Sequence, residues 1–113
     1  MYWLRMTPLW LIHEKLVNYY NVDYLTPFKD SKKSESIYIR QLFHYLSRTL
    51  NKNHISLQSI GDYYSDVTGN KWSHATVMHS ITKIEGYLQH DKTMIKEVNE
   101  IKKMFPSKLK NNN

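Results

Sequence analysis

The sequence predicts an all-α fold, a small helical bundle that contains a helix-turn-helix. Apolar residues recur at the 3.6-residue period of a helix in several segments. The clearest run consists of Ile39, Leu42, Phe43, Leu46 and Leu50. No segment shows the alternation of apolar and polar residues that is typical of a strand. Two helical patterns, at 56–64 and 73–88, follow one another as a helix-turn-helix requires. With 113 residues, 41% of them hydrophobic, the chain is long enough for one domain.

A first helix is expected from Pro8 to about residue 20. Thr7 is a good N-cap, and Pro8 suits the first helical position, where its missing N–H costs nothing. The apolar stripe of this helix consists of Ile12, Leu16, Val17 and Tyr20. Asn21 would end the helix. Residues 22–25 would add one turn that ends before Pro27, because the residue preceding a proline is disfavoured in the helical region.

A polar loop at 28–35 then leads into the central core helix at 36–50. The loop contains Lys32 and Lys33, and it is either a solvated connector or an arm that touches phosphates or enters a minor groove. Each large apolar side chain buried by the core helix contributes about 1.5–3 kcal/mol before the entropy cost. Its outward-facing residues are expected to be Arg40, His44, Ser47 and Arg48.

The helix-turn-helix pair follows. Ser56 would cap a short helix at 56–64, and a connector at 65–71 would lead to a second helix that begins near Ser73. The buried stripe of this second helix consists of Val77, Ile81, Ile84 and Leu88. Its opposite face consists of Ala75, Thr76, His79, Thr82, Lys83 and Gly86. This face, with one cation and no carboxylate, can approach a partner closely and donate hydrogen bonds to it.

The chain is expected to end with a last helix and a tail. Asp91 would cap the helix, and Pro106 would end it. Its apolar residues are Met94, Val98, Ile101 and Phe105. The predicted organisation is an apolar N-terminal segment at 1–8, a helix-turn-helix domain at 9–105 and a basic flexible tail at 106–113. The N-terminal segment either packs on the domain or contacts a partner, and it is too short and polar to span a membrane.

The composition restricts the classes of function. Sixteen Lys and Arg residues against ten Asp and Glu residues give a net charge of +6, which suits a polyanionic partner but also occurs in ribosomal and membrane-surface proteins. The absence of cysteine excludes disulfides, thiolate zinc sites and a cysteine nucleophile, and the cytosol is the default compartment.

Neither a metal site nor a catalytic site is expected, and no cofactor is predicted. Of the six histidines, His74 and His79 are closest in sequence, but five residues separate them by about 140° around a helix. The carboxylates show no pairing with a nucleophile or base, so we do not expect an enzyme.

Four motifs occur in order along the chain: Ile39-Arg40-Gln41, Tyr45-Leu46-Ser47-Arg48, Ser56-Leu57-Gln58-Ser59-Ile60-Gly61 and His74-Ala75-Thr76-Val77-Met78-His79-Ser80. This succession resembles the C-terminal DNA-binding domain (domain IV) of the bacterial replication initiator DnaA over about residues 9–105. The resemblance implies a Trp repressor-like fold and binding of double-stranded DNA as a monomer or weak oligomer. It also implies a nucleoid-associated, cytoplasmic protein that acts in replication initiation and its control or in transcription regulation.

The resemblance also assigns roles to residues. The helix that begins near Ser73 would lie in the major groove, with His74, Ala75 and Thr76 facing bases or nearby phosphates. Lys32 or Lys33 would stand where the family has a minor-groove arginine, and Arg48 and Lys83 at basic positions. The expected DNA-binding residues are Lys32, Lys33, Arg48, Trp72, Ser73, His74, Ala75, Thr76, His79 and Lys83.

The chain departs from the family at the positions that determine specificity. Trp72-Ser73 replaces an Arg-Asp pair, Ala75 replaces a threonine, and about five residues are inserted after Tyr64. Arginine reads guanine and a carboxylate reads cytosine, so the recognised sequence is expected to differ from the family's usual site. Trp72 would stack, wedge or pack. Thr76 is alternatively a second capping residue.

Two further interpretations stay open. Arg48 is alternatively a structural ion pair with Glu14 or Glu35. The whole chain is alternatively a protein-interaction module that kept the fold but lost DNA recognition, with tryptophans as anchors. The anchors would be Trp3, Trp10 and Trp72. A DNA-binding protein without an ATPase part would be a regulator or a targeting subunit, with replication or regulatory proteins as further partners.

Overall fold

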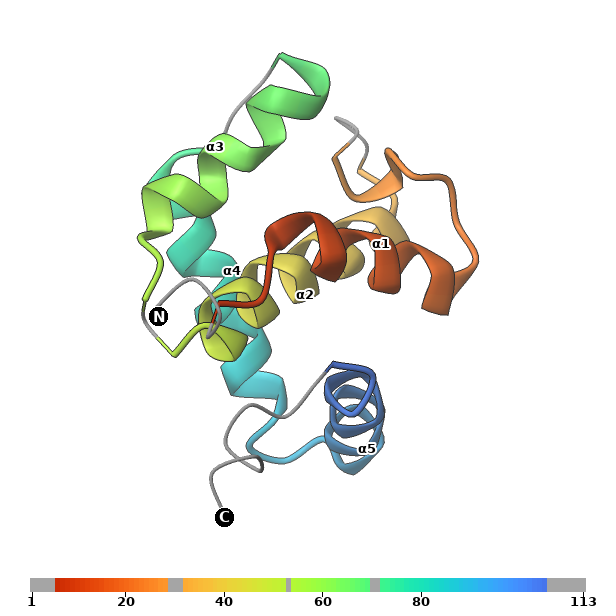
Figure 1. Ribbon diagram of the computed structural model, residues 1–113. Coiled ribbons are helices and arrows are strands. Elements are labelled where there is room, and N and C mark those ends of the chain that lie inside the picture. Colours follow the sequence, from red (N-terminus) through yellow and green to blue (C-terminus); the bar gives the residue numbers. More distant parts are fainter. Residues whose placement is uncertain (1–5, 29–31, 53, 70–71, 106–113) are drawn as a thin grey trace.

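The computed structural model describes residues 6–28, 32–52, 54–69 and 72–105, and within these ranges every regular element is helical (Figure 1). The elements are α1 (Leu9–Tyr20), a short 3-10 turn η2 (Thr26–Phe28), α2 (Ser34–Leu50), α3 (Leu57–Thr68), α4 (His74–Tyr87) and α5 (Lys92–Lys102). The predicted all-α bundle is confirmed. Among the described helices, none combines the length and the apolar character that crossing a membrane requires.

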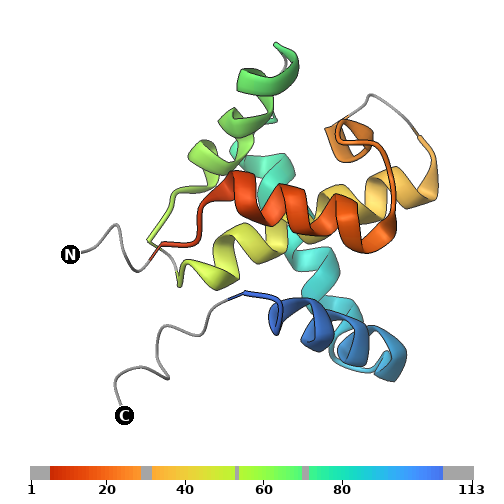
Figure 2. The ribbon, with the colours of Figure 1, turned by 45° about the vertical axis from the view of Figure 1, so that its right-hand side comes forward.

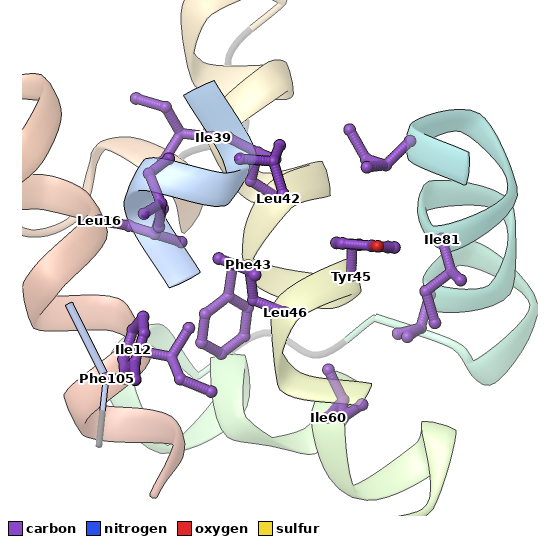
Figure 3. Close-up of a cluster of buried hydrophobic side chains, with 14 of the residues drawn as sticks. Ile12, Leu16, Ile39, Leu42, Phe43, Tyr45, Leu46, Ile60, Ile81 and Phe105 are labelled. Atoms are coloured by element: carbon purple, nitrogen blue, oxygen red, sulfur yellow. The ribbon is translucent and has the colours of Figure 1, made fainter. Parts of the chain in front are cut away.

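Helix α2 lies at the centre of the molecule, between α1 and α4 (Figures 1 and 2). Of its five predicted core residues, Ile39, Leu42, Phe43 and Leu46 are buried, and side chains from the other helices pack around them (Figure 3). The fifth, Leu50, is half-buried. His44 and Ser47, which were predicted to face outward, are also fully buried. The prediction was wrong because it assumed one solvent-facing side, whereas neighbours cover the middle of α2 on opposite sides.

The ends of α1 and the turn after it differ in part from the prediction. Helix α1 begins after Pro8, whose carbonyl accepts the first helical hydrogen bonds. Thr7 is not the N-cap, because the buried Asn51 side chain holds the Thr7 N–H (2.6 Å) and carbonyl (3.2 Å). Asn21 ends α1 in the left-handed conformation, as predicted. The next turn continues through Pro27 instead of ending before it, since Phe28 donates to the Leu25 carbonyl.

Helix α3 is one turn longer than predicted. It runs to Thr68, and Gly69 ends it with a φ of 86°. The segment expected to be a long connector is therefore largely helical. The predicted N-caps Ser56, Ser73 and Asp91 are confirmed, since each side chain accepts a hydrogen bond from the backbone three residues later. Helix α5 ends at Lys102. Pro106, the tail and residues 1–5 lie outside the described residues.

One carboxylate attaches α5 to the rest of the bundle. The phenols of Tyr20 on α1 and Tyr38 on α2 both donate to Oε2 of Glu97 on α5, the second at 3.0 Å. Burial raises the pKa of both phenols, and the hydrogen bond to Glu97 raises it further. Both groups therefore remain protonated donors, and three helices that are distant in sequence are joined at one point.

The backbone at Trp72 crosses α3 at Gly61, and this contact determines where α4 begins. The Trp72 N–H donates to the Gly61 carbonyl at 3.2 Å. A Cβ atom at residue 61 would lie 2.0 Å from the Trp72 carbonyl oxygen, which is far inside van der Waals contact. Glycine inside a helix is costly in itself, so the close approach explains its presence.

A buried hydrogen bond joins α2 to α4. Nδ1 of His44 lies 2.8 Å from Oγ of Ser80, and both side chains are buried. Burial and, to a smaller extent, the positive charge of Arg40 together lower the pKa of His44 to about 3. The imidazole is therefore neutral at physiological pH, and it positions α4 by a polar contact on an otherwise apolar face.

The Gly61 contact predicts the effect of a single methyl group. Gly61→Ala should lower the free energy of unfolding by about 1–3 kcal/mol, because the new Cβ meets backbone that cannot rotate away. Gly86→Ala is the matched control, since nothing lies within 4 Å of its Cβ position. The control should be neutral or stabilising by about 0.5–1 kcal/mol. Urea unfolding measures both, and equal stability of the two variants would contradict the close approach.

The buried His44 predicts a loss of stability in acid. The unfolded chain, with an ordinary histidine pKa of 6.5, takes up the proton before the folded protein does, so stability falls as the pH drops from 6.5 toward 3. Relative to non-titrating His44→Asn, the wild type should lose about 2 kcal/mol more between about pH 7 and about pH 5. His13, whose pKa burial also lowers, is present in both proteins. Urea unfolding at several pH values measures the stability of both proteins. If the free energies of unfolding of the wild type and of His44→Asn changed in parallel with pH, the low pKa assigned to His44 would be wrong.

Candidate nucleic-acid interface

Helix α4 has one buried and one exposed side, as predicted. Val77, Ile81 and Ile84 are buried in the core. Of the six residues predicted for the opposite face, four are exposed, namely Ala75, His79, Thr82 and Lys83, while Thr76 and Gly86 are half-buried. Because the apolar side fixes the helix to its neighbours, the other side is a rigid surface available to a partner.

The N-terminus of α4 is well defined. The Ser73 Oγ accepts a hydrogen bond from the Thr76 N–H at 3.2 Å, and the two side-chain hydroxyls lie 3.1 Å apart. Thr76 thus contacts the cap, as the alternative interpretation of this residue requires. The first N–H groups of a helix have no partner within the helix and carry the positive end of its dipole, an arrangement that suits a phosphate. His74 and Ala75 are exposed beside them.

Trp72, one of the predicted site residues, packs within the protein. Its ring is half-buried, and the guanidinium carbon of Arg40 lies 4.6 Å from the ring centroid. Arg40 also donates to the Pro27 carbonyl at 3.3 Å. Of the three roles that the sequence left open for Trp72, packing is the one that the structure shows. Arg40, predicted to face outward, is half-buried in this contact.

The basic residues of α2 lie at its two ends. Lys32 and Lys33 are exposed where the helix begins, and Lys33 is its N-cap residue. Arg48 is half-buried near the C-terminal end, where Nη1 donates to the Ile55 carbonyl at 3.2 Å and supports the loop before α3. Fifteen helical residues separate Lys33 from Arg48, about 22 Å along the axis, so the structure does not bring them together.

Two exposed residues of α4 were missed by the sequence analysis. Met78 is 46% exposed, although a methionine at the edge of a helical stripe is ordinarily assigned to the core. Glu85 is exposed seven residues later on the same side, so a carboxylate borders the face near its C-terminal end. Their angular positions around the helix could have revealed them, because both residues lie between the buried stripe and the centre of the opposite face.

The described residues provide no evident metal centre. Across residues 6–28, 32–52, 54–69 and 72–105, no three His, Cys, Asp or Glu side chains lie together in a way that could hold an ion. From His74 to Ile84, the polar chemistry that the exposed side of α4 offers is hydrogen bonding and positive charge. Lys83 lies at the edge of the exposed side, with its Nζ 5.8 Å from the centroid of the Tyr87 ring.

The chain matches no protein-family model, but it is similar to curated proteins. It is 33% identical over 94 residues to the chromosomal replication initiator protein DnaA of Caldanaerobacter subterraneus. The matched region covers 82% of this chain and 19% of that protein. It is 37% identical over 97 residues to DnaA of Enterococcus faecalis, with 85% and 20% covered. The chain thus spans about a fifth of the length of these relatives. The resemblance found in the motifs is confirmed, and the chain is a homologue of one domain-sized part of the chromosomal replication initiator protein DnaA.

Proposed function

We propose that the chain binds double-stranded DNA with a sequence preference, and that α3 and α4 act as a helix-turn-helix with α4 in the major groove. The observation that carries the proposal is the two-sided character of α4. Its apolar side is buried, and the exposed side chains of its first three turns are small, hydrogen-bonding, cationic or apolar, with no carboxylate from His74 to Ile84. Such a surface can approach the negatively charged groove without repulsion.

Two further observations support this function. The net charge of +6 favours a polyanionic partner. The similarity to a replication initiator makes replication initiation or its control the leading process, with transcription regulation as the other. We infer no enzymatic activity for the domain at 9–105, a cytoplasmic, nucleoid-associated location, and flanking roles for residues 1–8 and 106–113.

The site residues divide into two classes under this proposal. His74, Ala75 and His79 face the bases, with Thr76 shared between base contact and the cap. Phosphate contacts come from the N-terminus of α4 at Ser73 and from four basic residues. These residues are Lys32, Lys33, Arg48 and Lys83. Trp72 contributes chiefly by holding the surrounding structure, and Arg48 adds to its phosphate contact a hydrogen bond that supports the loop before α3.

A second candidate function is a protein-interaction module. Exposed aromatic side chains away from α4 favour it, namely Trp10 at 56% and Tyr24 at 49% exposed. Exposed hydrophobic residues that are scattered singly are common on soluble proteins, so this observation is the weaker of the two.

A salt titration separates the two candidates. If several lysines and the α4 N-terminus contact phosphates, the affinity for duplex DNA should fall steeply with salt concentration, with a slope of roughly 0.9 per contact in a double-logarithmic plot. Fluorescence anisotropy with a random duplex and with a duplex selected in vitro measures both affinity and preference. No binding to either duplex at low salt would favour the interaction module.

Two substitutions on α4 test the division of roles. Lys83→Gln should weaken all duplexes alike and reduce the salt slope by about 0.9, whereas His74→Ala should change which bases are preferred. Both residues are exposed, so neither variant should unfold. Lys103→Gln makes the same charge change on an exposed residue of another part of the chain and is the matched control.

The readout is selection from a random duplex library for His74→Ala and anisotropy at several salt concentrations for the lysine variants. An unchanged selected sequence for His74→Ala would remove His74 from the base-contacting set. Equal changes of slope for Lys83→Gln and Lys103→Gln would reduce the role of Lys83 to general attraction.

A further inference from the structure

Lysines line the outer side of α5, a helix that takes no part in the proposed helix-turn-helix. Lys92, Lys96, Asn99 and Lys103 are all exposed, and their spacing places them within about 60° of one another around the helix axis. Lys103 is the C-cap residue and has helical backbone angles, so it continues the row. Within the described chain, none of these lysines forms an ion pair. We call the four residues the α5 stripe.

The carboxylates of α5 lie away from this stripe or at its border. Glu97 faces the bundle, where it accepts the hydrogen bonds of two phenols. Asp91 caps the helix, and its side chain accepts a backbone N–H at 3.0 Å. Desolvation and, to a smaller extent, the negative charges of Glu100 and Glu97 raise the pKa of the Tyr19 phenol on α1, so Glu100 borders the stripe on the side toward α1. The stripe itself contains cations and an amide but no carboxylate.

The α5 stripe lies far from the surface that we propose for reading DNA. Helix α5 follows α4 in the chain, and both views of the fold show it beyond the C-terminal end of α4 (Figures 1 and 2). The 14 residues of α4 make that helix about 21 Å long. Val98 and Ile101 on the other side of α5 are buried, so the stripe faces outward. A duplex held at Ser73 therefore leaves the stripe free.

The composition of the α5 stripe favours a phosphate backbone over a protein or a membrane as its partner. Protein interfaces are built on apolar and aromatic anchors and are depleted in lysine, and the stripe contains no apolar residue. A helix that binds a membrane surface inserts an apolar face, whereas the apolar face of α5 is buried in the core. Phosphates are held by charge and by hydrogen-bond donors, which lysine and asparagine supply.

The length of the stripe also suits duplex DNA. Eleven helical residues separate Lys92 from Lys103, about 16 Å along the axis. A duplex presents one negative charge for about every 1.7 Å of its own axis, so three lysines along this length find phosphates at the same time.

We propose that the α5 stripe is a second DNA-binding surface, which holds the phosphate backbone of another duplex and allows one chain to join two DNA segments. The inference rests on the proposed function, because α4 holds the first duplex. Lysines that contact phosphates carry no sequence information, so the second duplex is bound without sequence preference and with strong salt dependence. A single chain thereby brings together two DNA sites that are distant in sequence.

A two-duplex capture assay tests this surface. A duplex selected by the wild-type chain is fixed to beads and saturated with the chain, and a fluorescent duplex of random sequence is added at several salt concentrations. The wild type should retain the second duplex with a salt slope of about 2.7 in a double-logarithmic plot, for three lysine contacts at roughly 0.9 each. The double variant Lys92→Gln with Lys96→Gln should lower this slope to about 0.9 and leave the affinity for the bead-bound duplex unchanged.

Lys15→Gln with Lys52→Gln is the matched control, since it removes two positive charges from other parts of the chain. It should retain the second duplex as the wild type does. Lysine and glutamine have similar helix propensities and the substituted α5 residues are exposed, so α5 folds in the double variant.

The outcomes separate this inference from the proposed function. No capture of the second duplex by the wild type, or equal capture by the α5 double variant, would overturn the inference while the proposed function stands. Capture of labelled polyglutamate without capture of the second duplex would assign the stripe to an acidic protein and would also overturn it. Failure of the wild type to bind any selected duplex would overturn both.

Discussion

The structure depends on the burial of α2 among its neighbours. This helix runs through the centre of the bundle, and α1, η2, α3 and α4 pack around it. Its fully buried apolar residues contribute about 1.5–3 kcal/mol each before entropy, which is more than any exposed ion pair provides. Because α4 packs on α2 through Val77, Ile81 and Ile84, the orientation of its exposed side follows from the packing of the core.

Polar and steric contacts make that orientation specific. Apolar stripes allow some sliding and rotation, whereas the hydrogen bond between His44 and Ser80 requires one register of α4 on α2. The contact of Trp72 with Gly61 places the residue before the Ser73 cap against α3. The surface that we propose to read DNA is thereby held from beneath and at its N-terminal end, which reduces the entropy cost of binding.

Sequence periodicity predicted what depends on a single helix, and it failed where two helices meet. The central helix, the last two helices, the caps of α3, α4 and α5, and the buried residues of α4 follow from local spacing, so they were predicted. His44 and Ser47 could not be placed by the same reasoning, because a helix enclosed on opposite sides buries polar positions that a one-stripe model exposes. The contact at Gly61 likewise involves Trp72, eleven residues away, and no local pattern encodes it.

The candidate site shows the same division. The exposed centre of α4 was predicted from its angular position, but the internal contacts of Trp72 and Arg48 depend on Arg40 and on the Ile55 carbonyl from other segments. Trp72 replaces a basic position of the DnaA motif and Arg48 matches one, yet here both side chains make contacts inside the protein. The function that we propose therefore rests on the residues of α4 that remain exposed.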